Sequence, residues 1–444
     1  MKQNIQLSDH FSYKRLIRFT TPSVLMMIFT SVYGVVDGFF VSNFVGKTPF
    51  AAVNFIMPFL MVVGVLGFMF GTGGSALIAK TMGEGNREKA QEIFSMLVYA
   101  TLISGVVIAV LSIIFLRPIA AFLGAEGSML DDCVLYGRII LAALPFLMAQ
   151  YAFGSFVITA EKPKFGLFLT VAAGLTNMIG DFLFIVVLDW ELVGAALATA
   201  LGQVVGGAIP LVYFARKNSS CLRIGRPKWD GSALLKTCTN GSSEFMSNVS
   251  MSLVGMLYNF RLMQYAGENG IAAYGTIMYI NFIFISVFIG YATGVAPVIS
   301  FHFGAANRAE VKGLLKRSTV LVLIASLLML VLSELCATPL SRIFVGYDQE
   351  LLDLTVHAFG IYALSFLFSG FAIFGSAFFT ALNDGLTSAL ISFLRTMLFQ
   401  SAAVLIMPLI WGLDGIWYSV VAAEILAVLV SLAFMAGKRK KYKY

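Results

Sequence analysis

The chain has 444 residues, of which 59% are hydrophobic and 12% are charged, and its formal net charge is +7. A soluble domain is about 45–50% apolar and about 25% charged, so this chain has too few charges to cover a globular surface. The composition therefore excludes a cytosolic enzyme, a disordered protein and a small secreted domain, and it favours a membrane protein.

Cysteine and histidine usage gives no sign of a disulfide framework or a metal site. The four cysteines have no paired spacing, and the three histidines lie far apart. The segment from Met1 to Arg18 is polar and basic, and the apolar run that follows is too long for a cleavable signal peptide. We therefore expect the first helix to be an uncleaved membrane insertion signal.

Twelve apolar runs are long enough to cross a bilayer, which takes about 20 residues in a helix. In chain order they lie near residues 16–40, 48–76, 93–116, 134–159, 165–188, 192–215, 237–265, 271–299, 315–336, 354–381, 386–410 and 414–436. The runs are continuous and do not alternate with a period of two, so they are not barrel strands. The sequence predicts an all-α membrane protein with about twelve transmembrane helices.

Basic residues mark one side of these spans. Most of the 30 Lys and Arg residues lie at the two ends of the chain and in the loops that follow the second, fourth, sixth and eighth spans. The positive-inside rule then predicts that both termini are cytoplasmic. The net charge of +7 is explained by a fringe that meets anionic lipid head groups, and it does not imply nucleic acid.

The two halves of the chain align without gaps at one constant shift in residue number. The matches include Gly46 with Gly267, Gly83 with Gly304, Arg87 with Arg308, Ser155 with Ser376, and Trp190 with Trp411. Six spans in each half give both repeats the same topology, which implies a pseudo-two-fold axis along the membrane normal. We predict an N-terminal bundle at 1–215, a cytoplasmic linker at 216–236 and a C-terminal bundle at 237–444, arranged around a central cleft.

Two similar bundles around a shared cleft suit transport by alternating access. A duplication that only stabilises a large bundle is the alternative. An ionisable side chain at membrane depth costs at least about 2.5–3.5 kcal/mol, so each one marks a candidate functional site. The candidates are Asp37, Asp181, Glu244, Arg261, Arg395 and Glu424.

The N-terminal half carries a polar set at helical spacing. Residues four apart share a helix face, and the pairs at this spacing are Tyr33 with Asp37, Asn177 with Asp181, and Thr199 with Gln203. Their oxygens could bind Na⁺, or the two carboxyl groups could share protons. Buried polar groups that only hold helices together are the alternative.

The repeat sharpens this prediction, because the polar set has no counterpart in the second half. At the shift that takes Gly46 to Gly267, Asp37 becomes Tyr258 and Asp181 becomes Ala402. A duplicated packing motif therefore does not explain the two acids.

Other residues at membrane depth have less definite roles. Pro22 lies in the same helix as Asp37 and is a candidate hinge, with a static kink as the alternative. Gln203 and Glu244 are candidates for the substrate cleft. Arg261 and Arg395 could neutralise Glu244 and Glu424, and a structural ion pair is the expected role of these arginines.

These features together resemble the MATE (multidrug and toxic compound extrusion) family over nearly the whole chain. The residues that carry the resemblance are Pro22, Asp37, Gly83 to Arg87, Asn177, Asp181 and Thr199, within the six-plus-six repeat. The polar set is similar to that of the DinF-like and MepA-like bacterial branches.

The resemblance implies cation-coupled export of varied, mostly cationic drugs or dyes from a bacterial plasma (inner) membrane. The ion or proton site would be formed by Asp37, Asn177, Asp181 and Thr199, with Tyr33 as a hydrogen-bond partner and Pro22 as the bend of the first helix. No cofactor is implied beyond H⁺ or Na⁺ as the coupling ion, and the expected state is a monomer among membrane lipids.

One departure from the family pattern concerns the second half. NorM-like members pair a glutamate in the seventh span with an acid in the tenth, but residues 359–380 contain no acid here. Glu244 is present without that partner, which favours coupling through the N-terminal bundle.

Two other classes of protein are alternatives. A lipid-linked oligosaccharide flippase would need several arginines in the cleft for its pyrophosphate, and the N-terminal half has two buried acids and no mid-span arginine. A membrane enzyme would need an acid–base set, a metal cluster or a nucleophile motif, and the sequence shows none.

Overall fold

The computed structural model describes residues 5–444, except for the side chains of residues 47 and 48, and these residues form helices without strands. The first half contains α1 (Tyr13–Phe40), α2 (Lys47–Gly83), α3 (Arg87–Leu123), α4 (Gly127–Ala142), α5 (Leu144–Thr159), α6 (Pro163–Asp181) and α7 (Glu191–Ala215). The second half contains α8 (Gly231–Gly304), α9 (Arg308–Val345), α10 (Gln349–Ala363), α11 (Phe366–Ala381), α12 (Gly385–Phe393), α13 (Gln400–Ile406) and α14 (Pro408–Tyr442). Three short π-helical segments complete the chain, η1 (Val41–Val45), η2 (Phe182–Val187) and η3 (Leu394–Phe399).

The twelve expected spans are present in the described residues. Nine helices are long and apolar enough to cross a membrane, and two bent pairs, α4 with α5 and α10 with α11, each form one further span. The 74-residue α8 holds two spans, because its backbone leaves the helical conformation at Gly267 (φ 59°, ψ −146°).

The bends inside the two pairs, of 56° and 49°, were not expected from the continuous apolar runs. In the first pair, Pro145 at the start of α5 has no N–H to continue the hydrogen bonding of α4. The chain therefore bends at Ala143, between α4 and α5.

The backbone keeps the internal repeat at its turns. Gly46 and Gly267 both have a positive φ, as do Gly85 and Ala306, and Glu191 and Gly412. Each pair lies between consecutive spans at equivalent positions of the two halves. Because left-handed residues occur at single turn positions, their recurrence shows that the halves share one backbone course.

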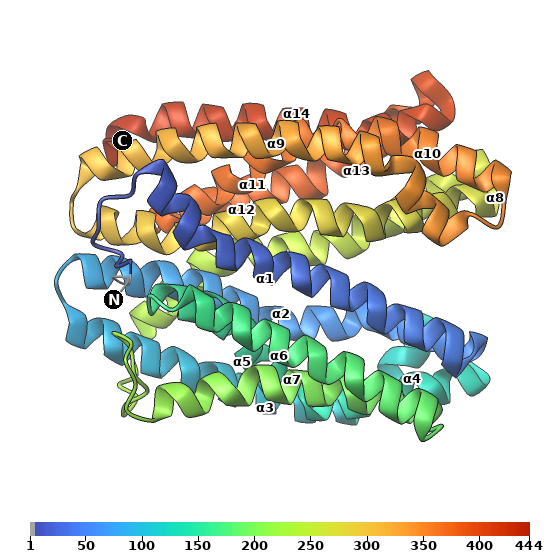
Figure 1. Cartoon of the computed structure of the whole chain (residues 1–444), viewed down its shortest axis with the longest axis horizontal. Coiled ribbons are helices and arrows are strands. Elements are labelled where there is room, and N and C mark those ends of the chain that lie inside the picture. The colour runs from blue at the N-terminus through green and yellow to red at the C-terminus, as the bar shows by residue number, and fades with distance from the viewer. Residues whose placement is uncertain (1–4) are drawn as a thin grey trace.

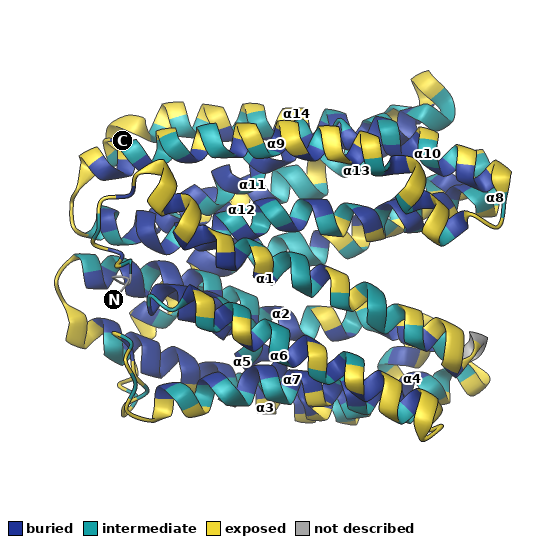
Figure 2. Ribbon diagram, in the orientation of Figure 1, coloured by how far each residue is buried: buried dark blue, intermediate teal, exposed yellow. Residues whose placement is uncertain are grey.

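The helices form two bundles, α1–α7 and α8–α14, which lie one above the other in Figure 1 with both termini at the same end. Residues 216–230 connect the bundles, so α8 begins at Gly231, inside the expected linker of residues 216–236. Many positions on the outer helices are exposed (Figure 2), and the exposed residues include apolar ones such as Ile114 on α3 and Ile324 on α9. Such surfaces suit hydrocarbon and would be unfavourable in water.

The bundles share a core at the end that carries the termini and have separate cores at the other end. One cluster of buried side chains joins both bundles at the first end, with Phe94 from one and Phe378 from the other. Toward the other end, each bundle has its own cluster, around Tyr136 in the first and Trp417 in the second. The ribbons diverge in the same direction (Figure 1), which is the arrangement that a central cleft requires.

Two equivalent glycines lie at the closed end, where α2 meets α8. A methyl group on Gly83 would overlap the carbonyl oxygen of Phe301, and one on Gly304 would overlap that of Lys80. Lys80 and Phe301 are themselves equivalent in the repeat, so the contact is symmetric. The pseudo-two-fold axis therefore passes between the two glycines.

The segments that lead into α1 and α8 each bind the opposite bundle. Before α1, the N–H of Phe11 donates to Glu310 of α9 (3.0 Å), and His10 also contacts that carboxylate (2.6 Å). Before α8, the N–H of Gly225 donates to Ser95 of α3 (2.9 Å). We call residues 5–12 and 216–230 the two straps.

Candidate functional site

Two of the acids within the membrane spans lie where an α-helix changes to a π-helical segment. Asp37 is in the last turn of α1, just before η1, and Asp181 ends α6, just before η2. A π-helical turn is rare and occurs often at functional sites, because it re-aims the side chains near it. Both acids are therefore presented by local backbone departures within their spans.

The structure brings together Asp37, Asn177 and Thr199 from three helices. The amide of Asn177 donates to Oδ1 of Asp37 at 3.1 Å, and the hydroxyl of Thr199 donates to the same oxygen at 3.1 Å. The Asn177 amide also lies 3.3 Å from the Thr199 hydroxyl. The close packing of α6 with α1 and α7 positions these three side chains.

Asp181 lies one helical turn after Asn177 and beside Asp37. Its side chain is fully buried, and neither of its carboxylate oxygens accepts a hydrogen bond within residues 5–444. Asp37 and Asp181 also form no ion pair with a described basic side chain. Two neighbouring carboxyl groups without a basic partner favour uptake of a cation or a proton.

Gln203 extends this set on α7, one turn after Thr199. Its side-chain oxygen and that of Asn177 are buried and accept no hydrogen bond in the described part of the chain. These two side-chain oxygens therefore remain open as acceptors, and oxygen is the ligand atom that a hard cation prefers.

Tyr136 of α4 is a site residue that the sequence did not predict. Its side chain is fully buried, and its hydroxyl has no hydrogen-bond partner among the described residues. The hydroxyl lies near Asp37, Asp181 and Thr199. Nothing in the sequence distinguishes this tyrosine, because its position in the site depends on how α4 packs against the other helices.

Tyr33 lies near Asp37 but does not make the expected hydrogen bond with it in the part of the chain that is described. Its ring is half-buried and packs against Phe29, with the ring centres 6.1 Å apart. Tyr33 therefore borders the site as an aromatic wall.

Pro22 lies far from the two acids along α1. The helix continues through it to Phe40, and it is buried where Thr20 and Ser23 meet Gly294 of α8. A hinge role for Pro22 thus stays a prediction.

The remaining charges fall into two groups. Arg395 forms an ion pair with Glu424 at 2.8 Å, which is the structural role expected for it. Arg261 instead donates to the Gln264 side chain (3.1 Å) and the Leu405 carbonyl (3.2 Å). It does not pair with Glu244, which is half-buried and makes no ion pair among the residues described.

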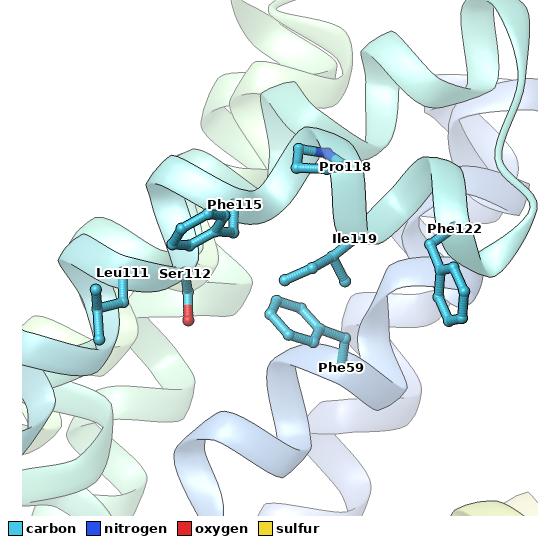
Figure 3. A pocket seen from close by; sticks show the side chains of 7 residues that line it. All are labelled: Phe59, Leu111, Ser112, Phe115, Pro118, Ile119 and Phe122. Carbon is cyan, nitrogen blue, oxygen red and sulfur yellow. The ribbon is translucent and has the colours of Figure 1, made fainter.

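An apolar groove of about 400 Å³ lies away from these acids, between α2 and α3 (Figure 3). It is lined by Phe59, Leu111, Ser112, Phe115, Pro118, Ile119 and Phe122. The lining contains no ionisable group, so the groove does not have the chemistry of a cation site.

Comparison with known proteins places the chain in a family. The family model described as MatE matches residues 22–183 and 245–404, one stretch in each half. The multidrug export protein MepA of Staphylococcus saprophyticus is 25% identical over 433 residues, which cover 95% of this chain and 92% of that protein.

Solved structures share the fold over the whole chain. A MATE protein crystallised in complex with MaL6 superimposes with a TM-score of 0.94 at 22% identity, and the match covers 100% of both chains. An outward-facing multidrug resistance MATE family transporter of the MOP superfamily also gives 0.94 at 22% identity, covering 100% of this chain and 99% of that one. Because the family model matches well over half of its residues, the chain belongs to the MATE family of membrane transporters.

Proposed function

We propose that this protein is a secondary active multidrug efflux transporter that exports cationic amphipathic compounds in exchange for H⁺ or Na⁺. The observation that carries this proposal is the pair Asp37 and Asp181, which lie side by side within the membrane spans without a basic partner in the described chain. The relative MepA is named a multidrug export protein, which supports the export direction and a varied substrate range.

The N-terminal site can alternate between two kinds of cation. Asp37, Asn177, Asp181 and Thr199 supply oxygens to Na⁺, or the two acids take up protons. A cationic drug competes for the same negative charge, so binding of the coupling ion releases the drug and binding of the drug releases the ion. Neither exchange leaves the acids as uncompensated charges in the membrane.

Apolar contacts provide the breadth of the substrate range. Aromatic side chains such as Tyr33 attract organic cations through their ring faces, and flexible methionines adapt to different shapes. Gln203 and Glu244 complete the proposed cleft as polar contacts. This combination favours amphipathic cations over any one structure.

The closed contact at Gly83 and Gly304 supports a proposal about the side of the membrane to which the present conformation opens. We propose that the protein resides in a bacterial plasma membrane as a monomer, with both termini in the cytoplasm. The contact between the glycines then closes the cytoplasmic side, and the diverging ends of the bundles face outward. The conversion to an inward-facing state requires one bundle to rock against the other.

A lipid-linked oligosaccharide flippase fits the site less well. Its pyrophosphate would require free basic side chains within the membrane. Arg395 is engaged by Glu424, and the N-terminal site contains acids and neutral polar groups. The electrostatic sign of the site thus favours a cationic substrate.

Transport in inverted vesicles tests the proposal. A ΔpH and a Na⁺ gradient are imposed in separate experiments. A cationic dye should accumulate in one of the two, and the gradient that drives the accumulation identifies the coupling ion. Asp37→Asn should reduce this transport about 10–100-fold, as loss of an interaction with a charged group does. Glu334→Gln is the matched control, because it makes the same acid-to-amide change on the exposed face of α9. Wild-type coupling in Asp37→Asn would contradict the proposed site.

A further inference from the structure

The C-terminal bundle contains a buried ion pair that the proposed transport mechanism does not use. Glu424 of α14 is 2% exposed, and Arg395 of η3 is 15% exposed. The Nε atom of Arg395 lies 3.0 Å from both carboxylate oxygens of Glu424, and Nη2 lies 2.8 Å from Oε1. The guanidinium group therefore covers the whole carboxylate.

The repeat places this ion pair at the counterpart of the N-terminal site. In the alignment of the two halves, Glu424 corresponds to Gln203, and Arg395 corresponds to Gly174. Gln203 lies one turn from Thr199, and Gly174 lies against Tyr33 and Phe29. The two bundles thus hold polar groups at equivalent places, with a net negative set in one and a neutral pair in the other.

Tyrosines lie around the ion pair of Glu424 with Arg395. Tyr258 and Tyr362 lie close enough to interact with the charge of Glu424, and Tyr274 stacks on Tyr258 with ring centres 5.1 Å apart. The Tyr258 hydroxyl is 2.7 Å from the hydroxyl of Ser419. Arg395 is the charged group that faces Glu424, and the titratable neighbours from α8 and α10 are these tyrosines.

The fold does not require an ion pair at this place. The N-terminal bundle has the same order of spans with a glutamine and a glycine at the two positions, and the glycine lies in the α-helix α6. A buried ion pair is also weak evidence for stability, because apolar residues of similar volume often replace one without loss. The pair is, in addition, presented by η3, as the acids of the N-terminal site adjoin η1 and η2.

We propose that Arg395 is a built-in counter-cation that fills a latent cation site on Glu424. Because the carboxylate is already neutralised, the C-terminal bundle takes up no coupling cation of its own. Without Arg395, the isolated carboxyl group would take up a proton, since a lone carboxylate offers too few oxygens for a metal ion. The statement about coupling rests on the proposed function, whereas the latent site does not.

Infrared spectroscopy of the purified full-length protein tests the latent site, because a protonated carboxyl group has a C=O band that a carboxylate lacks. The parent for this experiment is Asp37→Asn/Asp181→Asn, which removes the acids of the N-terminal site. In that parent, Arg395→Met should gain a protonated-carboxyl band at neutral pH. The band should be absent from Arg395→Met/Glu424→Gln, the matched control with a neutral pair. Folded Arg395→Met protein without the band would overturn the proposal.

A second comparison keeps the test decisive if Arg395→Met does not fold. If Arg395 neutralises Glu424 as proposed, the parent and the neutral double variant should show the same protonated-carboxyl region. A band in the parent that the double variant lacks would mean that Glu424 already carries a proton, and the proposal would be wrong. Because the N-terminal acids are absent from every protein compared, the result does not depend on the proposed coupling role of Asp37.

Discussion

In the N-terminal bundle, Asp37 and Asp181 lie together without a basic partner in the described chain, whereas in the C-terminal bundle Arg395 covers Glu424. The two bundles follow one backbone course, down to the left-handed residues at equivalent turns. The bundles differ in the side chains that they bury and in the positions of their π-helical segments. In the proposed mechanism, one copy of the duplicated fold exchanges ions, while the other copy keeps its charge internally balanced.

The largest effect that distinguishes the bundles is expected from the same acid-to-amide change in each. Glu424→Gln should lower the free energy of unfolding by about 3–5 kcal/mol, because it leaves Arg395 buried without its partner. Asp181→Asn should cause no comparable loss, because it removes a carboxyl group that has no basic partner and accepts no hydrogen bond in the described chain. Thermal unfolding in detergent measures both, and Arg395→Met/Glu424→Gln should restore most of the loss. Equal effects of the two amide variants would refute the comparison.

A smaller effect is expected where the bundles touch. Gly83→Ala should destabilise the closed contact by about 1–3 kcal/mol, because the added methyl group meets the backbone of α8. Gly304→Ala should have a similar effect, since the contact is symmetric. Cysteine cross-linking between α2 and α8 at this end measures the effect, because a loosened contact should lower the yield of cross-linked protein. Gly255→Ala is the control, because a methyl group there meets no neighbouring atom; a comparable loss in that variant would show that the contact is not special.

The smallest effect concerns the equivalent loops at the end that carries the termini. Burial of Asp384 opposes its ionisation, but hydrogen bonds from Lys438, Tyr442 and Thr387 outweigh this and lower its pKa to about 2. Burial raises the pKa of Glu161 in the other loop, although the N–H of Leu7 opposes the shift. The two acids should therefore respond to pH with opposite signs.

For Asp384, the depressed pKa means stability that is present above its unfolded value of 3.8 and is lost as the pH falls toward 2. Asp384→Asn should cost about 1–2 kcal/mol at neutral pH and nothing at the acid limit. For Glu161, the raised pKa means stability that is present at low pH and lost as the pH rises. Glu161→Gln should consequently be neutral or slightly stabilising at neutral pH. Unfolding measured across this pH range checks both signs. A free energy of unfolding that is unchanged in Asp384→Asn at neutral pH would contradict the prediction for Asp384.

The spans and the repeat were predictable from the sequence because both depend on local and periodic features. Apolar runs of bilayer length define the helices, and one constant shift relates the halves. The meeting of Asp37, Asn177 and Thr199 was predictable in outline, because ionisable residues at depth tend to gather in the bundle interior. The ion pair of Arg395 with Glu424 was predictable because an unpaired charge within the membrane is costly.

Features that depend on the packing of particular helices were not predictable. Tyr136 lies in the site because α4 packs against α7, and a run of apolar residues does not show which helices will pack together. Arg261 finds Gln264 and the Leu405 carbonyl instead of Glu244, because only the packed bundle decides which groups a long side chain can reach. Tyr33 likewise turns its ring toward Phe29.

The two straps have a consequence for the order in which the chain assembles. His10 contacts Glu310 across 300 positions of sequence, so the strap before α1 cannot bind until the start of α9, the third span of the second half, has been synthesised. The linker strap, by contrast, finds Ser95 in a bundle that is already complete. After the first half has inserted, residues 5–12 therefore still lack their contacts with Glu310. These contacts form only when α9 has been added. If the chain were cut at the linker, the N-terminal fragment would lack Glu310, which binds the strap before α1. The C-terminal fragment would lack Ser95, which binds the strap before α8.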